Sequence, residues 1–173
     1  MAIQRMFPVG HIGSGIIPSA EWKAAAGATN GAWDKGAILI GIAGTGGDLN
    51  ARFLTQGGTD PTKIIGVAEA DGPQATDSQT FARYVPALPD VLFEATLSHG
   101  GTAIPLADSH MFAEYPVTKS GSGASALWYV NTATGADSST ARFRVLRLKD
   151  ATGTNDGRVF GVFTIDSTIY GIS

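Results

Sequence analysis

The chain of 173 residues contains 23 glycines, 8 prolines and no cysteine, and only 16% of its residues are charged. The absence of cysteine excludes disulfides and thiolate metal sites, and the abundance of turn-forming residues favours short strands over a helical bundle. Proteins bind nucleic acid mainly through clustered cations, and a net charge of −3 does not by itself attract it. We therefore expect no nucleic-acid partner.

In the N-terminal segment 1–32, apolar residues are scattered among glycine, proline and serine without a sustained period. This segment is predicted to form an extended arm. It has no apolar run long enough for a signal peptide or a membrane span, so we expect no membrane partner. The stretch "SAEWKAAA" predicts a short helix with Ser19 as its N-cap and Gly27 after its end. Single apolar anchors cannot be buried on the arm itself, so it must lie along its own domain, as a strand of its own sheet, or along a neighbouring subunit. These anchors are Phe7, Ile12, Ile16, Ile17 and Trp22.

The stretch "GAILIGIAGTGGD" combines an apolar strand with a glycine-rich loop. A P-loop requires Lys followed by Ser or Thr where this chain has Gly47 and Asp48, and the dinucleotide pattern requires a glycine where it has Leu49. The spacing therefore predicts no nucleotide cofactor. It predicts a hairpin loop between strands 37–43 and 49–55, where glycine allows backbone angles that other residues avoid.

Residues 33–173 alternate short β-rich runs with clusters of turn residues, which is typical of an all-β sandwich or barrel. No long helical period separates the runs, so a parallel α/β fold is not expected. The segment "PLADSHMFAEYP", bracketed by Pro105 and Pro116, is predicted to contain one or two helical turns. We expect one compact antiparallel β-barrel or β-sandwich domain, with strands at 37–43, 49–55, 63–69, 80–85, 91–97, 126–131, 140–149 and 158–165.

Strands 140–149 and 158–165 are predicted to form a hairpin with a long polar tip, "DATGTNDG". In the first strand apolar residues alternate with arginines, but the alternation reverses at Val145-Leu146. That reversal predicts either a β-bulge or burial of both faces at that end. The second strand, "RVFGVFTI", is apolar on both faces, which predicts a central or covered position.

Residue types used in catalysis are present, but their spacing does not predict an enzyme. Asp108, Ser109 and His110 are adjacent, whereas a catalytic triad needs three side chains in one hydrogen-bonded line. The three histidines lack the short spacings of a metal site. Asp90 and Glu94 would lie about 13 Å apart on a strand that rises about 3.3 Å per residue, and they are interpreted as solvated charges. We therefore expect no catalytic residue, no metal and no cofactor.

The predicted hairpin carries five of the twelve cations of the chain, at Arg142, Arg144, Arg147, Lys149 and Arg158. This basic face is interpreted first as a solvated sheet face or as an edge protected against aggregation. An acidic protein partner is the alternative, because arginine side chains pair well with carboxylates.

The pair Trp128-Tyr129 would be a sugar-binding platform if both rings faced solvent. Alternation along a strand puts the two rings on opposite faces of the sheet. At least one of them is therefore expected in the core, and the pair does not by itself predict a carbohydrate site.

The segments "FARYVPALPDVLFEATLS" (81–98) and "STARFRVLRLKDATGTNDGRVFGVF" (139–163) resemble the capsid decoration, or cement, proteins of tailed bacteriophages. In that family a late pair of strands is joined by a loop of the type K-D-x-x-G-T-x-x-G-R-V, seen here from Lys149 to Val159. The stretches "GAWDKGAILI" and "KIIGVAEADG" also look like the opening strands of such head proteins. The arm has no motif that matches the family.

This resemblance implies a structural protein of the virion that binds the outer surface of an assembled phage head and cross-links subunits of the major capsid protein. It also implies synthesis in the host cytoplasm, a homodimer or homotrimer, and no catalysed reaction. From the residues we add the hypothesis that the arm anchors bind a neighbouring subunit while the hairpin makes polar contacts, through Arg142, Arg144, Asp150, Asn155 and Arg158. The alternative function is a carbohydrate- or receptor-binding β module of a phage fibre or tail.

Overall fold

The structure, a computed structural model, is nearly all-β. It describes residues 6–12, 16–23, 33–43, 52–72, 81–121, 126–164, 166 and 168. A short 3₁₀ turn, η1 (Asp108–His110), lies inside the segment where one or two helical turns are predicted. The strands are β1 (Phe7–His11), β2 (Ala20–Lys23), β3 (Ile38–Ala43), β4 (Arg52–Gln56), β5 (Ile64–Ala68), β6 (Phe81–Pro86), β7 (Val91–His99), β8 (Thr102–Ala103), β9 (Glu114–Tyr115), β10 (Val117–Ser120), β11 (Leu127–Asn131), β12 (Phe143–Leu148) and β13 (Arg158–Phe163).

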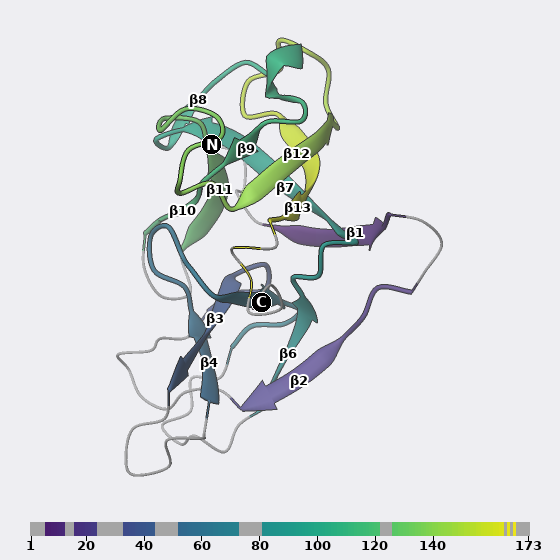
Figure 1. Cartoon of the computed structure of the whole chain (residues 1–173), viewed down its shortest axis with the longest axis vertical. Helices are drawn as coiled ribbons and strands as arrows, with labels where there is room; N and C mark the ends of the chain where they lie inside the picture. Colours follow the sequence, from purple (N-terminus) through teal and green to yellow (C-terminus); the bar gives the residue numbers. More distant parts are fainter. Residues whose placement is uncertain are drawn as a thin grey trace.

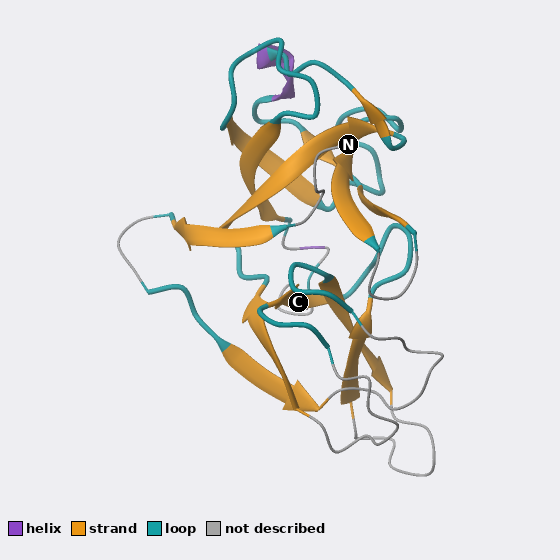
Figure 2. Cartoon of the chain, turned by 180° about the vertical axis from the view of Figure 1, so that it is seen from behind, coloured by secondary structure: helices purple, strands orange, loops and turns teal. Residues whose placement is uncertain are grey.

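The strands form two sheets, which lie one above the other in Figure 1. An eight-stranded sheet curls into a nearly closed barrel in the order β10-β11-β7-β13-β12-β9, with β1 and β8 paired to β7. The five-stranded sheet has the order β2-β6-β5-β3-β4. Figure 2 shows both bodies from behind, with η1 at the end of the barrel that lies away from the five-stranded sheet. The expected all-β class is therefore confirmed.

The barrel nearly closes because one stretch of chain provides the strands at both ends of the eight-stranded sheet. β9 pairs with β12, whereas β10, which follows directly after Pro116, pairs with β11. Pro116 has no backbone N–H to donate to a neighbouring strand, and its carbonyl oxygen accepts a hydrogen bond from the backbone N–H of Asn131 at 2.8 Å. At this proline the chain therefore stops pairing with β12 and begins to pair with β11.

Aromatic rings fill the barrel. Phe93, Phe143 and Phe163 are at most 1% exposed and come from the adjacent strands β7, β12 and β13. The ring of Phe163 meets both others edge to face, with centroids 5.1 Å from Phe93 and 5.6 Å from Phe143. This arrangement suits the charge distribution of aromatic rings, whose edges are positive and whose faces are negative.

Mainly aliphatic side chains fill the core at the five-stranded sheet, together with the buried Tyr84 of β6. β5 is its central strand and is buried along its whole length. Ile38, Leu39 and Ile64 are fully buried and belong to the same continuous core as the rings of the barrel. At Gly66 the backbones of β5 and β6 approach closely, because a Cβ there would lie 2.2 Å from the carbonyl oxygen of Val85.

The loop between β4 and β5 contacts the barrel. A Cβ at Gly57 would lie 2.9 Å from Pro61 Cβ and 3.1 Å from the ring of Trp128, so only glycine fits there. Lys119 Nζ lies 5.7 Å from the centre of the Trp128 ring and donates a hydrogen bond to Gln56 Oε1 at 3.4 Å. Burial at this junction lowers the pKa of Lys119 below its usual value.

β12 and β13 form the predicted hairpin, and β13 lies between β7 and β12, in the predicted central position. Their register shifts between Val145 and Arg147, which confirms the β-bulge predicted where the alternation reverses. Arg144 pairs with Val162, and Arg147 pairs with Phe160. Because the bulge adds one residue to β12, Arg144 and Arg147 lie on the same outer face of the barrel.

β3 and β4 pair antiparallel, which confirms the hairpin expected on either side of the glycine-rich loop. The second strand begins at Arg52 rather than at residue 49. An antiparallel pair leaves no place for the crossover helix of a nucleotide-binding βαβ unit. Residues 44–51 themselves lie outside the described residues.

The described part of the arm lies along its own chain. β1 pairs antiparallel with β7 of the barrel, and β2 pairs antiparallel with β6 of the five-stranded sheet (Figure 1). The helix predicted from "SAEWKAAA" is wrong over Ala20–Lys23, which form β2, because backbone pairing with β6 outweighs the weak helix propensity of so short a segment. Ser19, the predicted N-cap, donates instead to Glu69 Oε2 at 2.5 Å. Residues 24–32 lie outside the described residues.

Candidate functional site

The arm presents large apolar side chains to solvent near the junction of the two sheets. Val9, Ile12 and Ile16 are 39%, 56% and 92% exposed, and we name these three residues the arm surface. Single exposed apolar residues are ordinary on protein surfaces, whereas several in one short segment are typical of a contact site. Two of the five predicted anchors, Ile12 and Ile16, therefore belong to this surface, and a third, Trp22, is also exposed.

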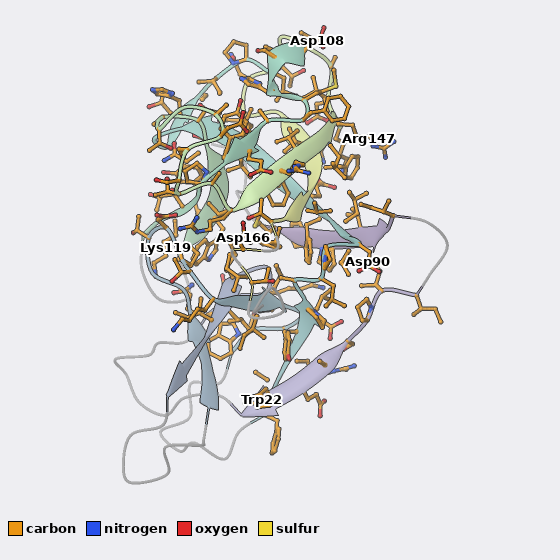
Figure 3. All side chains as sticks on the ribbon, in the orientation of Figure 1. Trp22, Asp90, Asp108, Lys119, Arg147 and Asp166 are labelled. Carbon is orange, nitrogen blue, oxygen red and sulfur yellow. The ribbon has the colours of Figure 1, made fainter. Side chains whose placement is uncertain are left out.

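The other predicted anchors contact their own chain. Phe7 and Ile17 are half-buried, and Ile17 packs against the hydrophobic core. Trp22, labelled in Figure 3, lies on β2 opposite the buried Ala82 and is 47% exposed. The arm thus uses Phe7 and Ile17 for its own attachment and leaves the arm surface open for a partner.

Carboxylates of the same chain pair with four of the five hairpin cations within the described residues. Arg142, whose side chain is only 15% exposed, lies 4.0 Å from Asp60 across the junction of the two sheets. Arg144 Nε donates to Glu114 Oε1 at 2.8 Å. The predicted basic face is therefore largely neutralised within the molecule, in agreement with its first interpretation as a sheet face.

The other two paired cations meet at Glu94, on β7. Lys149 Nζ lies 2.5 Å from Glu94 Oε2, and Arg158 Nη1 lies 3.3 Å from Glu94 Oε1. The Arg158 side chain also donates to both carboxylate oxygens of Asp150, at 2.9 and 3.0 Å. These hydrogen bonds hold the pKa of Asp150 below its usual value and raise the pKa of Arg158. Of the predicted polar contacts, only Asn155, at the hairpin tip, is exposed without such an ion pair.

Arg147 differs from the other hairpin cations. Its guanidinium carbon lies 4.6 Å from the centre of the Phe160 ring, in cation–π geometry. Lys149 lies over the same ring at 5.7 Å while bound to Glu94. Among the described residues no carboxylate pairs with Arg147, so an acidic partner would find one available cation here rather than five.

A surface hollow of about 350 Å³ opens where β9, β12 and the end of β13 meet. Its volume is at the small end of the range for ligand sites. Two carboxylates and one guanidinium line it, and Figure 3 labels one of these carboxylates, Asp166, at the margin of the barrel that faces the five-stranded sheet. The lining residues are Pro89, Glu114, Arg144, Val162, Phe163, Thr164 and Asp166.

Asp108, Ser109 and His110 form the turn η1 and do not form a triad. His110 Nδ1 accepts a hydrogen bond from the backbone N–H of Ala107 at 3.1 Å, whereas Asp108 Oδ1 accepts one from Thr152 Oγ1 at 3.1 Å. Burial lowers the pKa of His110. Across the described part of the chain, no group of three or more His, Cys, Asp or Glu side chains is placed to hold a metal ion.

The rings of Trp128 and Tyr129 are 1% and 4% exposed. The expectation that at least one of them belongs to the core is confirmed, since both are buried. The pair therefore offers no aromatic platform to a sugar.

Sequence reasoning missed the carboxylates that organise the outer face of the barrel. Glu94 is interpreted from the sequence as a solvated charge, yet its side chain is only 13% exposed, between two cations. Glu94 lies between the inward-facing Phe93 and Ala95, so alternation places its side chain on the outer face. Together with the cations of the hairpin, this position indicates an ion pair. No such signal exists for Glu114 or Asp166, which lie on a two-residue strand and after the last strand.

No protein-family model, curated protein or solved structure matches this chain. None of the helical segments that the structure describes is long and apolar enough to cross a membrane. The function is therefore inferred from two features, the arm surface and the outer face of β12 and β13.

Proposed function

We propose that this chain is a capsid decoration protein, which binds the outer surface of an assembled phage head and cross-links subunits of the major capsid protein. Two features support the proposal. The segments that resemble such proteins, 81–98 and 139–163, provide β6 of the five-stranded sheet and β7, β12 and β13, which are adjacent strands of the barrel. The arm surface provides an apolar contact outside this rigid body.

The observation that carries the proposal is the exposure of the arm surface. Ile16 is 92% exposed and Ile12 is 56% exposed, and full burial of one isoleucine side chain contributes about 1.5–3 kcal/mol. β1 and β2, on either side, are already paired, so we expect a modest entropy cost when the arm binds. Many copies on one head would act together, so that weak single contacts give firm retention.

Polar contacts of the hairpin contribute less in this proposal. Arg142, Asp150 and Arg158 already have partners on their own chain, and a capsid subunit would have to compete with them. Asn155 remains the polar contact that we expect at the hairpin tip. Attachment should therefore depend only weakly on ionic strength, because salt screens charged contacts and not apolar ones.

A test of this proposal changes the arm surface and leaves the barrel intact. Deletion of residues 1–20 would be unsuitable, because it removes β1 and the fully buried Met6 together with the anchors. The double substitution Ile12→Ser, Ile16→Ser alters only exposed side chains. We expect it to weaken binding to heads purified without the protein by roughly tenfold or more, measured by co-sedimentation.

The matched control is Phe81→Ser, which removes another exposed apolar side chain, 58% exposed, from the five-stranded sheet. This variant should bind as the unaltered protein does. Electron microscopy of heads purified with and without the protein should show added density on their outer surface. The proposal is wrong if heads purified with and without the protein show the same density. It is also wrong if the double substitution and Phe81→Ser bind heads equally well.

A further inference from the structure

The outer face of β12 and β13 has a positive region and a negative region that follow one another along the strands. Arg147 pairs with Phe160 and Arg144 with Val162 across the hairpin, and both arginines lie on the outer face because of the bulge. Phe160 and Val162 are two residues apart on β13, so the two rows lie about 7 Å apart along the strand. The face therefore has two adjacent regions, one around Arg147 and one at the hollow.

The region around Arg147 is positive. Arg147, Lys149 and Arg158 supply three positive charges, and Glu94 and Asp150 supply two negative ones, which leaves a charge of +1. The excess charge is on Arg147, since the other four groups are paired with one another. Its position over Phe160 limits the conformations of its side chain before any partner arrives.

The hollow is negative. Glu114 and Asp166 supply two negative charges and Arg144 one positive charge, which leaves −1. Arg144 is bound to Glu114 through Oε1, whereas Asp166 is exposed and has no ion pair among the described residues. Pro89, which is exposed, lines the hollow with apolar surface, against which the methylene groups of an arginine can pack.

We propose that two copies of this chain form a symmetric dimer through this face, with Arg147 of each copy in the hollow of the other. A two-fold axis that lies in the plane of the interface, midway between the two regions and perpendicular to the line that joins them, brings each positive region over the partner copy's negative region. Such an interface is isologous, because the same patch is used twice. In each contact the guanidinium reaches Asp166.

This inference rests on the proposed function only in that the resemblance implies a homodimer or homotrimer, and it can fail separately from capsid binding. The three residues of the arm surface, which carries the capsid proposal, are not among those that make the proposed dimer contact. Dimerisation is measured on the isolated protein, without heads. If the protein is a monomer and still binds heads, only the dimer proposal is overturned. If it is a dimer and does not bind heads, only the capsid proposal is overturned.

The test reverses each charge singly and then mixes the two variants. Arg147→Glu places a carboxylate against the acidic hollow, and Asp166→Arg places a cation against Arg147, so each variant alone should be monomeric. We expect the dissociation constant of the dimer to rise roughly tenfold or more in each, measured by analytical ultracentrifugation. In a mixture, every contact again joins opposite charges, so a one-to-one heterodimer should form.

The control is Lys35→Glu, which reverses an exposed cation beside the five-stranded sheet and should leave the dimer unchanged. Added salt should weaken the unaltered dimer, because the contact depends on charge. The inference is overturned if the unaltered protein is monomeric or trimeric at every concentration. It is equally overturned if both single variants remain dimers, or if the mixture stays monomeric while each variant is folded by circular dichroism.

Discussion

The barrel and the five-stranded sheet share one hydrophobic core but are filled in different ways. Around Phe163 the barrel packs large rings edge to face, and its path of strands nearly closes. The five-stranded sheet packs mainly aliphatic side chains. Strands approach more closely than a Cβ would permit in both bodies, at Gly66 in the sheet and at Gly161 in the barrel. The barrel should therefore be the more sensitive of the two to lost volume, whereas both should be sensitive to added volume.

Their outer faces differ as well. In the barrel, Glu94 is only 13% exposed and is shared by cations from β13 and from the residue after β12. In the five-stranded sheet, Arg83 lies 3.5 Å from Glu21 with both side chains about 60% exposed, at 62% and 59%. The comparison indicates that ion pairs stabilise the barrel more than the sheet, because solvent screens the exposed pair.

The largest effect is expected from lost volume in the barrel. Phe163→Ala removes a ring that contacts two others and should lower the free energy of unfolding by about 3–5 kcal/mol. Leu39→Ala, in the five-stranded sheet, should cost about 2–5 kcal/mol. Because the core is continuous, both variants should still unfold in a single urea transition. Two separate transitions would show that the two bodies are independent.

Added volume should reveal the sensitivity of the sheet. Gly66→Ala forces a Cβ against the carbonyl of Val85 and should cost about 1–3 kcal/mol in the free energy of unfolding. Gly58→Ala is the matched control, since its Cβ would meet nothing within 4 Å. Thermal unfolding measures both variants. Equal melting temperatures would contradict the close approach of β5 and β6.

The ion pairs should give a smaller difference. Glu94→Gln removes the charge that Lys149 and Arg158 share and should cost about 1 kcal/mol, after allowance for the solvent that reaches both cations. Glu21→Gln should change stability by less than about 0.5 kcal/mol. Urea titrations at low salt compare the two substitutions. A larger loss for Glu21→Gln would reverse the comparison.

The smallest effect is expected from pH. Because hydrogen bonds from Arg158 lower the pKa of Asp150 in the folded state, this carboxyl contributes stability above its usual pKa of 3.8. The contribution begins to decline as the pH falls through that value and is lost once the pH is below the folded-state pKa. Unfolding curves between pH 5 and pH 2 should therefore be less pH-dependent in Asp150→Asn. An unchanged slope would show that the pair contributes nothing.

Local patterns predicted the barrel hairpin well, since the reversal at Val145-Leu146 indicated the bulge and the apolar run of β13 indicated its central position. They failed at Ala20–Lys23, where the partner strand β6 lies some sixty residues away in the sequence and decides the conformation. The division into two sheets was also unpredicted. It depends on which strands pair across long separations, which alternation within a strand does not encode.

The candidate site was predicted only in part, for a similar reason. The apolar anchors of the arm were found from the sequence, but which of them face solvent was not, because the half-burial of Phe7, for example, depends on the pairing of β1 with β7. The cations of the hairpin were found, but their carboxylate partners were not, because those come from distant elements. The hollow has no counterpart in any single stretch of sequence.

The change of pairing partner at Pro116, from β12 to β11, affects how the protein behaves at high concentration. Residues 114–120 provide the strands at both ends of the barrel path, and these strands are short, since β9 has two residues and β10 has four. Long unpaired edge strands let molecules join through backbone hydrogen bonds into fibrils. Two short ends joined by one continuous stretch offer another molecule little backbone to pair with.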